Sequence, residues 1–216
     1  KGKQVLSEIN LRLEAGNIYG FVGPNGSGKT MLLRAIAGLL YIKYGSVKYN
    51  SSLFKGVIIE NPAFINSFTG LENLRYLASI RSTIRDTDIK ATMKRVGLDP
   101  EDTRKVRVYS LGMKQRLGLA TALLANPDIL ILDEPINGLD PEGIRWVRNF
   151  LQSFVNEGKT VLMTSHYMSE LELTVDHLVG ISNGKIVIDA PTKDILKQFG
   201  SFEEAYFKAL EGKEGE

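Results

Sequence analysis

Short apolar segments along the chain predict β-strands. Apolar and polar residues alternate over residues 3–13, which predicts strands with one solvent-facing side. Residues 17–22 form a short apolar run, and residues 46–49 and 56–59 are two further strand-like runs. Ile129–Leu132 is apolar throughout, which is typical of a strand buried on both faces of a parallel sheet.

The rest of the chain combines further strands with helices. Residues 160–164 predict a strand, and residues 177–182 and 185–189 predict a hairpin because an Asn-Gly pair separates them. Periodic apolar positions and helix start and stop signals predict helices over residues 31–40, 71–80, 86–96, 111–125 and 141–156, and two more helices close the chain. This order predicts an α/β core interrupted by a helical insertion.

Composition narrows the function classes. The 216 residues are enough for one sizeable domain with a core. A net charge of +2 is too small to argue for nucleic acid, and the absence of cysteine excludes a disulfide framework and a thiolate metal site. No apolar run approaches the length that spans a bilayer, so we expect any membrane span to come from another chain.

Residues 23–30 carry the strongest chemical signal. They read Gly-Pro-Asn-Gly-Ser-Gly-Lys-Thr, a G-x-x-x-x-G-K-S/T phosphate-binding loop between a predicted strand and a predicted helix. Glycines let backbone N–H groups surround an anion, Lys29 adds positive charge for the outer phosphates, and Thr30 offers a hydroxyl to magnesium. The predicted phosphate-binding residues are Gly23, Pro24, Asn25, Gly26, Ser27, Gly28, Lys29 and Thr30.

Two acids follow the buried strand at 129–132. Asp133 and Glu134 therefore lie at the carboxyl end of a parallel strand, where open α/β sheets bind ligands. We expect Asp133 to hold magnesium through water and Glu134 to orient and polarise an attacking water. The alternative is an acidic turn before Pro135, which is disfavoured because two adjacent acids after an apolar strand are costly unless solvated or metal-bound.

The same region resembles a known family. Residues 131–135, Ile-Leu-Asp-Glu-Pro, and residues 137–141, Asn-Gly-Leu-Asp-Pro, resemble the Walker B motif and the D-loop of ATP-binding-cassette (ABC) ATPases. Residues 109–116, Tyr-Ser-Leu-Gly-Met-Lys-Gln-Arg, are similar to the family signature, and Ser165-His166 resembles its switch histidine. These motifs stand in family order and cover nearly the whole chain.

The resemblance implies an α/β fold of the P-loop NTPase kind. We expect a RecA-like, mostly parallel sheet core, an N-terminal antiparallel β subdomain and an inserted α-helical subdomain. Residues 1–216 would form a single ABC ATPase domain. Within it, residues 1–60 and 126–216 would make the catalytic core with the β subdomain, and residues 61–125 the helical subdomain with the signature.

The resemblance also implies a site shared by two copies. Ser110 and Gly112 would cap the γ-phosphate bound to the loop of a second copy, with Asp140 at the nucleotide and His166 on the γ-phosphate. Taken alone, Ser110 is also a good helix N-cap, so a plain N-capped core helix stays the alternative. The predicted catalytic residues are Glu134, His166 and Lys29.

Two positions depart from the family pattern. Glu60 stands where the family normally has a glutamine, which resembles the ATPases of bacitracin-resistance and lantibiotic-immunity exporters. We predict that Glu60 approaches magnesium together with Thr30 and Asp133; a drifted position without substrate meaning is the alternative. No aromatic residue stands near Lys1 to stack on adenine, so adenine recognition stays undefined.

The implied ligands are ATP and Mg²⁺. The implied partners are a second ATPase subunit, as homodimer or heterodimer, and a separate integral-membrane subunit that contacts residues 64–74; no nucleic acid is expected. The expected place is the cytoplasmic face of the membrane, with ATP hydrolysis driving export of a peptide antibiotic or drug. The alternative is a soluble ABC ATPase. A DNA-repair type is disfavoured because Glu60 and Ser110 are only 50 positions apart, too few for an inserted coiled coil.

Overall fold

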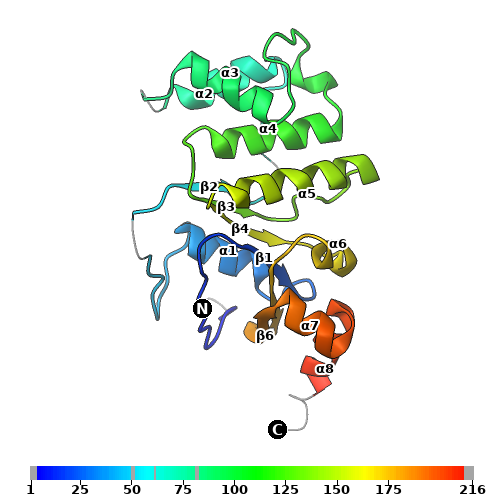
Figure 1. Cartoon of the computed structure of the whole chain (residues 1–216). Coiled ribbons are helices and arrows are strands. Elements are labelled where there is room, and N and C mark those ends of the chain that lie inside the picture. Colours follow the sequence, from blue (N-terminus) through cyan, green and yellow to red (C-terminus); the bar gives the residue numbers. More distant parts are fainter. Residues whose placement is uncertain (1–3, 50–51, 61, 81–82, 212–216) are drawn as a thin grey trace.

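The computed structural model describes residues 4–49, 52–60, 62–80 and 83–211. Its centre is a six-stranded sheet with the order β2-β3-β4-β1-β5-β6, in which only β6 runs antiparallel to its neighbour (Figure 1). The strands are β1 (Ile18–Val22), β2 (Lys55–Ile58), β3 (Ile129–Leu132), β4 (Thr160–Thr164), β5 (His177–Ser182) and β6 (Lys185–Pro191). The predicted mostly parallel α/β core is confirmed.

The sheet separates two apolar cores, because successive side chains of a strand point to opposite faces. On β3, Leu130 and Leu132 belong to the larger core, which contains the apolar side of α5 (Pro141–Asn156). Ile129 and Ile131 belong to the smaller core, which contains the apolar residues of α1 (Lys29–Ala37). Helices therefore cover both faces, which explains why β1, β3 and β4 are buried along their whole length.

Helices between β2 and β3 extend the larger core beyond the sheet edge. They are α2 (Gly70–Ala78), α3 (Asp86–Arg95), the 3₁₀ turn η1 (Val106–Val108) and α4 (Leu111–Leu123). Figure 1 shows α2, α3 and α4 at the end of the molecule away from α7 (Thr192–Phe199) and α8 (Phe202–Glu211). A Cβ at Gly56 of β2 would lie 2.5 Å from the carbonyl oxygen of Ala122, so the glycine lets α4 approach the β2 backbone.

The predicted N-terminal antiparallel strands are wrong. The described residues of 3–13, and residues 46–49, form no strand, while residue 3 lies outside the described residues. The alternation at the N-terminus nevertheless has a packing role: Leu6, Ile9, Leu11 and Leu13 cover the smaller core without a ladder. Residues 46–49 are exposed, and none of the strands that the structure describes pairs with them. A strand without a partner would leave its backbone N–H and C=O groups unpaired.

The remaining predictions of elements fit closely, with ends that differ by a few residues. The predicted helix over 31–40 begins earlier and ends earlier, because Gly38 adopts a left-handed conformation and caps α1. Sequence reasoning missed η1 and the short helix α6 (Met168–Glu172). Among the described residues, every helix is too short or too polar to cross a bilayer.

Candidate functional site

The loop over residues 23–28 joins β1 to α1 and is shaped by glycine. Gly23 and Gly28 have φ values of 148° and 112°, in the region that residues with a Cβ rarely adopt. A Cβ at Gly23 would lie 2.1 Å from the carbonyl oxygen of Ile181, so no larger residue fits. Gly28 is the N-cap of α1 and has no side chain to cap it, which leaves the first N–H groups of the helix for an anion.

Lys29 is buried beneath this loop, with only 6% of its surface exposed. Its ammonium donates to the carbonyl oxygens of Gly23, at 2.7 Å, and Pro24, at 3.1 Å. Burial lowers the pKa of Lys29, and the nearby carboxylates of Glu134 and Asp133 act in the opposite direction. The lysine thus places a positive charge inside the loop, where phosphate oxygens would be.

Ser27 provides a test of whether the loop suits an anion. Its hydroxyl oxygen is buried and makes no hydrogen bond to any residue that the structure describes. A buried polar group without a partner costs about 1–3 kcal/mol. A phosphate oxygen in the loop would accept a hydrogen bond from this hydroxyl, so the residues present fit a phosphate group.

Asp133 links the loop to the sheet. Its carboxylate accepts a hydrogen bond from the hydroxyl of Thr30 at 2.8 Å and another from the hydroxyl of Thr164 at 2.5 Å. The described residues hold no cluster of three or more histidine, cysteine or carboxylate side chains suited to a metal. One carboxylate and one hydroxyl fit Mg²⁺, which is usually bound by few protein oxygens together with waters and substrate phosphates.

Glu134 lies beside Asp133 with its carboxylate against the predicted switch histidine. Its carboxylate lies within hydrogen-bond distance of Nε2 of His166, and it also accepts a 3.3 Å hydrogen bond from the side-chain amide of Asn137. Its φ of 51° is uncommon for a residue with a side chain, and its backbone N–H donates to the Thr164 hydroxyl at 2.8 Å. The structure therefore brings together Glu134 and His166, two of the predicted catalytic residues.

Thr164 is a residue of the candidate site that sequence reasoning missed. It is fully buried at the end of β4, and its one hydroxyl holds both acids: it donates to Asp133 and accepts from the Glu134 backbone. The available signal was a hydroxyl residue at the carboxyl end of the strand over 160–164, next to the strand that carries the acids.

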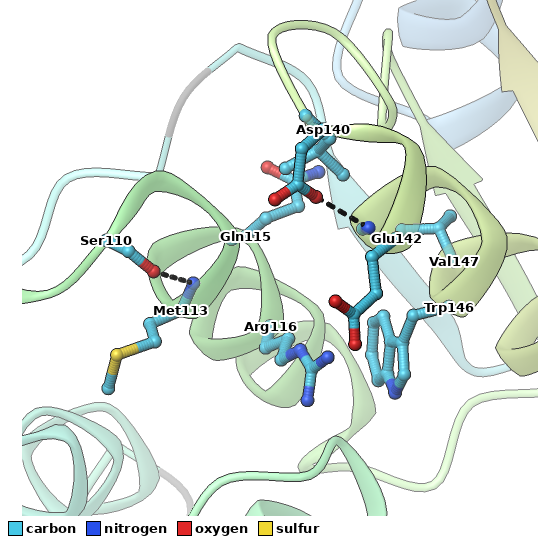
Figure 2. A pocket seen from close by; sticks show the side chains of 11 residues that line it. Ser110, Met113, Gln115, Arg116, Asp140, Glu142, Trp146 and Val147 are labelled. Carbon is cyan, nitrogen blue, oxygen red and sulfur yellow. Dashed lines mark hydrogen bonds between the residues drawn. The ribbon is translucent and has the colours of Figure 1, made fainter.

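The signature and D-loop residues form a second group. Ser110 caps α4 through a 3.2 Å hydrogen bond from the Met113 backbone, and Asp140 caps α5 through a 2.7 Å bond from Gly143. Figure 2 shows both side chains at one pocket of about 250 Å³, which Gly112 also lines. Within the described residues, no hydrogen bond or ion pair joins Ser110 or Asp140 to the phosphate loop.

Glu60 forms no bond to the other predicted metal ligands among the described residues. Its carboxylate ion-pairs with Arg34 of α1, and the described residues show no hydrogen bond between Glu60 and Thr30 or Asp133. Its role at the metal stays a prediction.

The fold and the loop define a nucleoside-triphosphate-binding α/β domain of the P-loop class. The profile of the ABC transporter family matches residues 6–137, and the chain belongs to this family of ATP-binding domains. It is an ABC ATPase domain, as the sequence predicted.

Relatives and solved structures agree with this assignment. The chain is 37% identical to the bacitracin transport ATP-binding protein BcrA of Enterococcus faecalis, over 97% of the chain and 71% of that protein. It is 35% identical to the lantibiotic transport ATP-binding protein SrtF of Streptococcus pyogenes, over 87% of the chain and 84% of that protein. Identity to the uncharacterized ABC transporter ATP-binding protein YdbJ of Bacillus subtilis is 42% over 85% of the chain, which spans only 63% of that relative. A solved ATP-binding subunit of an ABC transporter has the same fold, with a TM-score of 0.82, 24% identity, and coverage of 95% of this chain and 93% of that one.

We expect Thr164→Val to weaken both the fold and the site. The change removes the hydroxyl that holds Asp133 and leaves the Glu134 N–H unpaired, which should cost about 1–3 kcal/mol in the free energy of unfolding. Loss of this anchor should slow ATP hydrolysis by about 10–100-fold. Urea unfolding and a phosphate-release assay measure the two effects. Thr164→Ser keeps the hydroxyl and should stay close to the unchanged chain; equal losses in both variants would refute the anchoring role.

Proposed function

We propose that this chain binds ATP with Mg²⁺ and hydrolyses it as the energy-coupling subunit of a membrane exporter. The observation that carries the proposal is the hydrogen-bonded group Thr30, Asp133, Thr164, Glu134 and His166 beside the loop that holds Lys29. Together with the loop, this group provides a phosphate-binding surface, oxygen ligands for a cation and a carboxylate that can accept a proton from water.

The proposed roles follow from the positions of these groups. The loop and Lys29 bind the phosphates, while Thr30 and Asp133 hold Mg²⁺, which neutralises charge on the phosphate oxygens when bound. Glu134 orients a water and accepts its proton as the water oxygen bonds to the γ-phosphorus and the bond to ADP breaks. His166, whose Nε2 contacts the Glu134 carboxylate, is the proposed side-chain contact to the γ-phosphate.

We further propose that the complete site needs two chains. Ser110, Gly112 and Asp140 border a pocket of their own and are not bonded to the phosphate loop within the described residues. A head-to-tail pair would place this surface of one copy on the loop of the other, and the N-terminus of α4 would face the γ-phosphate. Both a homodimer and a heterodimer with a related ATPase satisfy this arrangement.

Transport is proposed from the relatives, whose names record bacitracin and lantibiotic transport. The substrate class would be a peptide antibiotic or drug, moved by a separate membrane subunit, with this chain at the cytoplasmic face of the membrane. Residues 64–74 are the proposed contact, and residues 61–125 the proposed helical subdomain; α2, α3 and α4 fall within it. The competing proposal is a soluble ABC ATPase without a membrane partner.

Glu134→Gln should abolish turnover without abolishing ATP binding. The amide keeps the size of the side chain but cannot accept the proton of water, so hydrolysis should fall by about 100-fold or more. The trapped ATP complex should accumulate as a dimer, measured by light scattering with saturating ATP and Mg²⁺. Glu203→Gln makes the same change at an exposed position of α8 and should leave the rate of hydrolysis unchanged. Turnover at the parental rate in Glu134→Gln would exclude Glu134 as the proton acceptor.

Two inactive variants should complement each other if the site is shared. Lys29→Ala removes the positive charge proposed to bind the phosphates. Ser110→Asp keeps an N-cap residue but adds a negative charge that repels the γ-phosphate. A mixed dimer contains one intact site, so an equal mixture should recover about a quarter of the parental ATPase rate. A mixture as inactive as its two components would argue against a head-to-tail site.

The exporter proposal predicts a membrane partner. The tagged chain, purified from detergent-solubilised membranes of its host, should carry an integral-membrane protein with it. Phe68→Ala, within the proposed contact, should reduce this co-purification, whereas Phe207→Ala on exposed α8 should not. Recovery of the chain without any membrane protein would favour the soluble alternative.

A further inference from the structure

One ion pair beside the site has no part in the chemistry above. Arg34 lies in the last turn of α1, and its guanidinium pairs with the carboxylate of Glu60, two positions beyond the end of β2. Thr30 stands four positions before Arg34, so both lie on one face of α1. Thr30 donates a hydrogen bond to Asp133, which follows β3, and Arg34 pairs with Glu60, which follows β2. One face of α1 therefore contacts the carboxylates that follow two strands.

The two carboxylates emerge from adjacent strands. Ile58 of β2 pairs with Leu132 of β3, and the Asp133 backbone N–H donates to the carbonyl oxygen of Ile58 at 2.8 Å. Glu60 therefore leaves the sheet next to Asp133, at the edge where the cation is expected. A free Glu60 carboxylate at this edge would offer further oxygen ligands to a cation and would add negative charge beside a triphosphate.

The contact that restrains Glu60 is exchangeable. The Glu60 side chain is 71% exposed and that of Arg34 is 31% exposed, and exposed ion pairs are weak because water and salt compete for both partners. Glu60 also has a φ of 70°, which only the surroundings can maintain in a residue with a side chain. By contrast, the buried Thr164 anchor of Asp133 is shielded from water.

We propose that Arg34 is a positioning residue that keeps Glu60 off the divalent cation site until the cation arrives with the nucleotide. Arg34 neutralises Glu60 in the free chain, and Glu60 exchanges Arg34 for the cation when Mg²⁺ and ATP bind together. The inference rests on the proposed function, because it takes Thr30 and Asp133 as the cation site. It explains how a carboxylate can stand at this position without attracting a cation prematurely.

The test uses Mn²⁺ alone as the probe, with affinity measured by water-proton relaxation on the full chain. Arg34→Gln frees Glu60 and should tighten Mn²⁺ binding by about threefold to fivefold, the range that an exposed ion pair supplies. Adding Glu60→Gln to Arg34→Gln should remove this gain. Arg34→Lys keeps the positive charge and should restore an affinity close to that of the unchanged chain.

Arg75→Gln is the matched control. It breaks another half-exposed pair, between Arg75 and Asp86, which joins α2 to α3. Mn²⁺ affinity should not change in this variant. A gain as large as that of Arg34→Gln would mean that any lost arginine has this effect, and it would overturn the proposal.

A second measurement follows the pair itself. A double-mutant cycle on Arg34 and Glu60, read by thermal unfolding, should show coupling in the free chain and none with Mg²⁺ and a non-hydrolysable ATP analogue bound. Equal coupling in both states, or unchanged Mn²⁺ affinity in Arg34→Gln, overturns the proposal while leaving hydrolysis intact. Absence of Mn²⁺-ATP binding by the unchanged chain would instead refute the proposed function, and this inference with it.

Discussion

The lateral pairing of β3, β4 and β1 is the constraint on which the site depends. These parallel strands end at one edge, so the residues that follow each of them meet there although they are far apart in sequence. Thr164 ends β4, Asp133 follows β3, and Thr30 enters α1 after the loop that follows β1. The hydrogen bonds through Asp133 join all three elements, so a shift of register would separate the proposed cation ligands from the loop.

The core and the loop were predictable because their signals are local. The apolar run over 129–132 needs burial on both faces, and the motif over 23–30 needs a strand before it and a helix after it. Both requirements follow from backbone and solvation physics that neighbouring residues already specify. The N-terminal segment shows where this reasoning fails. The alternating apolar residues Leu6, Ile9, Leu11 and Leu13 indicate only which side of the segment is buried. An extended segment that packs on a core without pairing shows the same alternation as a β-strand in a sheet.

The positions of the acidic residues in the candidate site could be predicted from the sequence. Their hydrogen-bond and ion-pair partners could not. Asp133, Glu134 and His166 lie within two positions of the end of a buried strand, so the sequence places them at the sheet edge. Thr164 and Arg34 act through contacts across 31 and 26 positions, and no spacing rule reveals such partners. Glu60 illustrates the difference: its position beside the site was predictable, while its pairing with Arg34 needed the geometry of α1 against β2.

At this edge of the sheet, Asp133 and Glu134 are held by buried hydrogen bonds, whereas Glu60 is held by an exposed ion pair. In the proposed function Asp133 and Glu134 keep one geometry, and the buried Thr164 hydroxyl gives each of them a hydrogen bond that is shielded from water. Glu60 needs a partner that can be replaced, and its exposed pair with Arg34 offers that. The orphan hydroxyl of Ser27 and the left-handed backbones of Glu134 and Glu60 each oppose folding by about 1–3 kcal/mol. Such strain persists only where the surrounding structure maintains it, and β1, β3 and β4 beside it are buried along their whole length. A phosphate group that accepts a hydrogen bond from Ser27 would relieve part of this cost. Binding of a nucleotide to the folded chain would therefore add to the stability of this edge of the sheet.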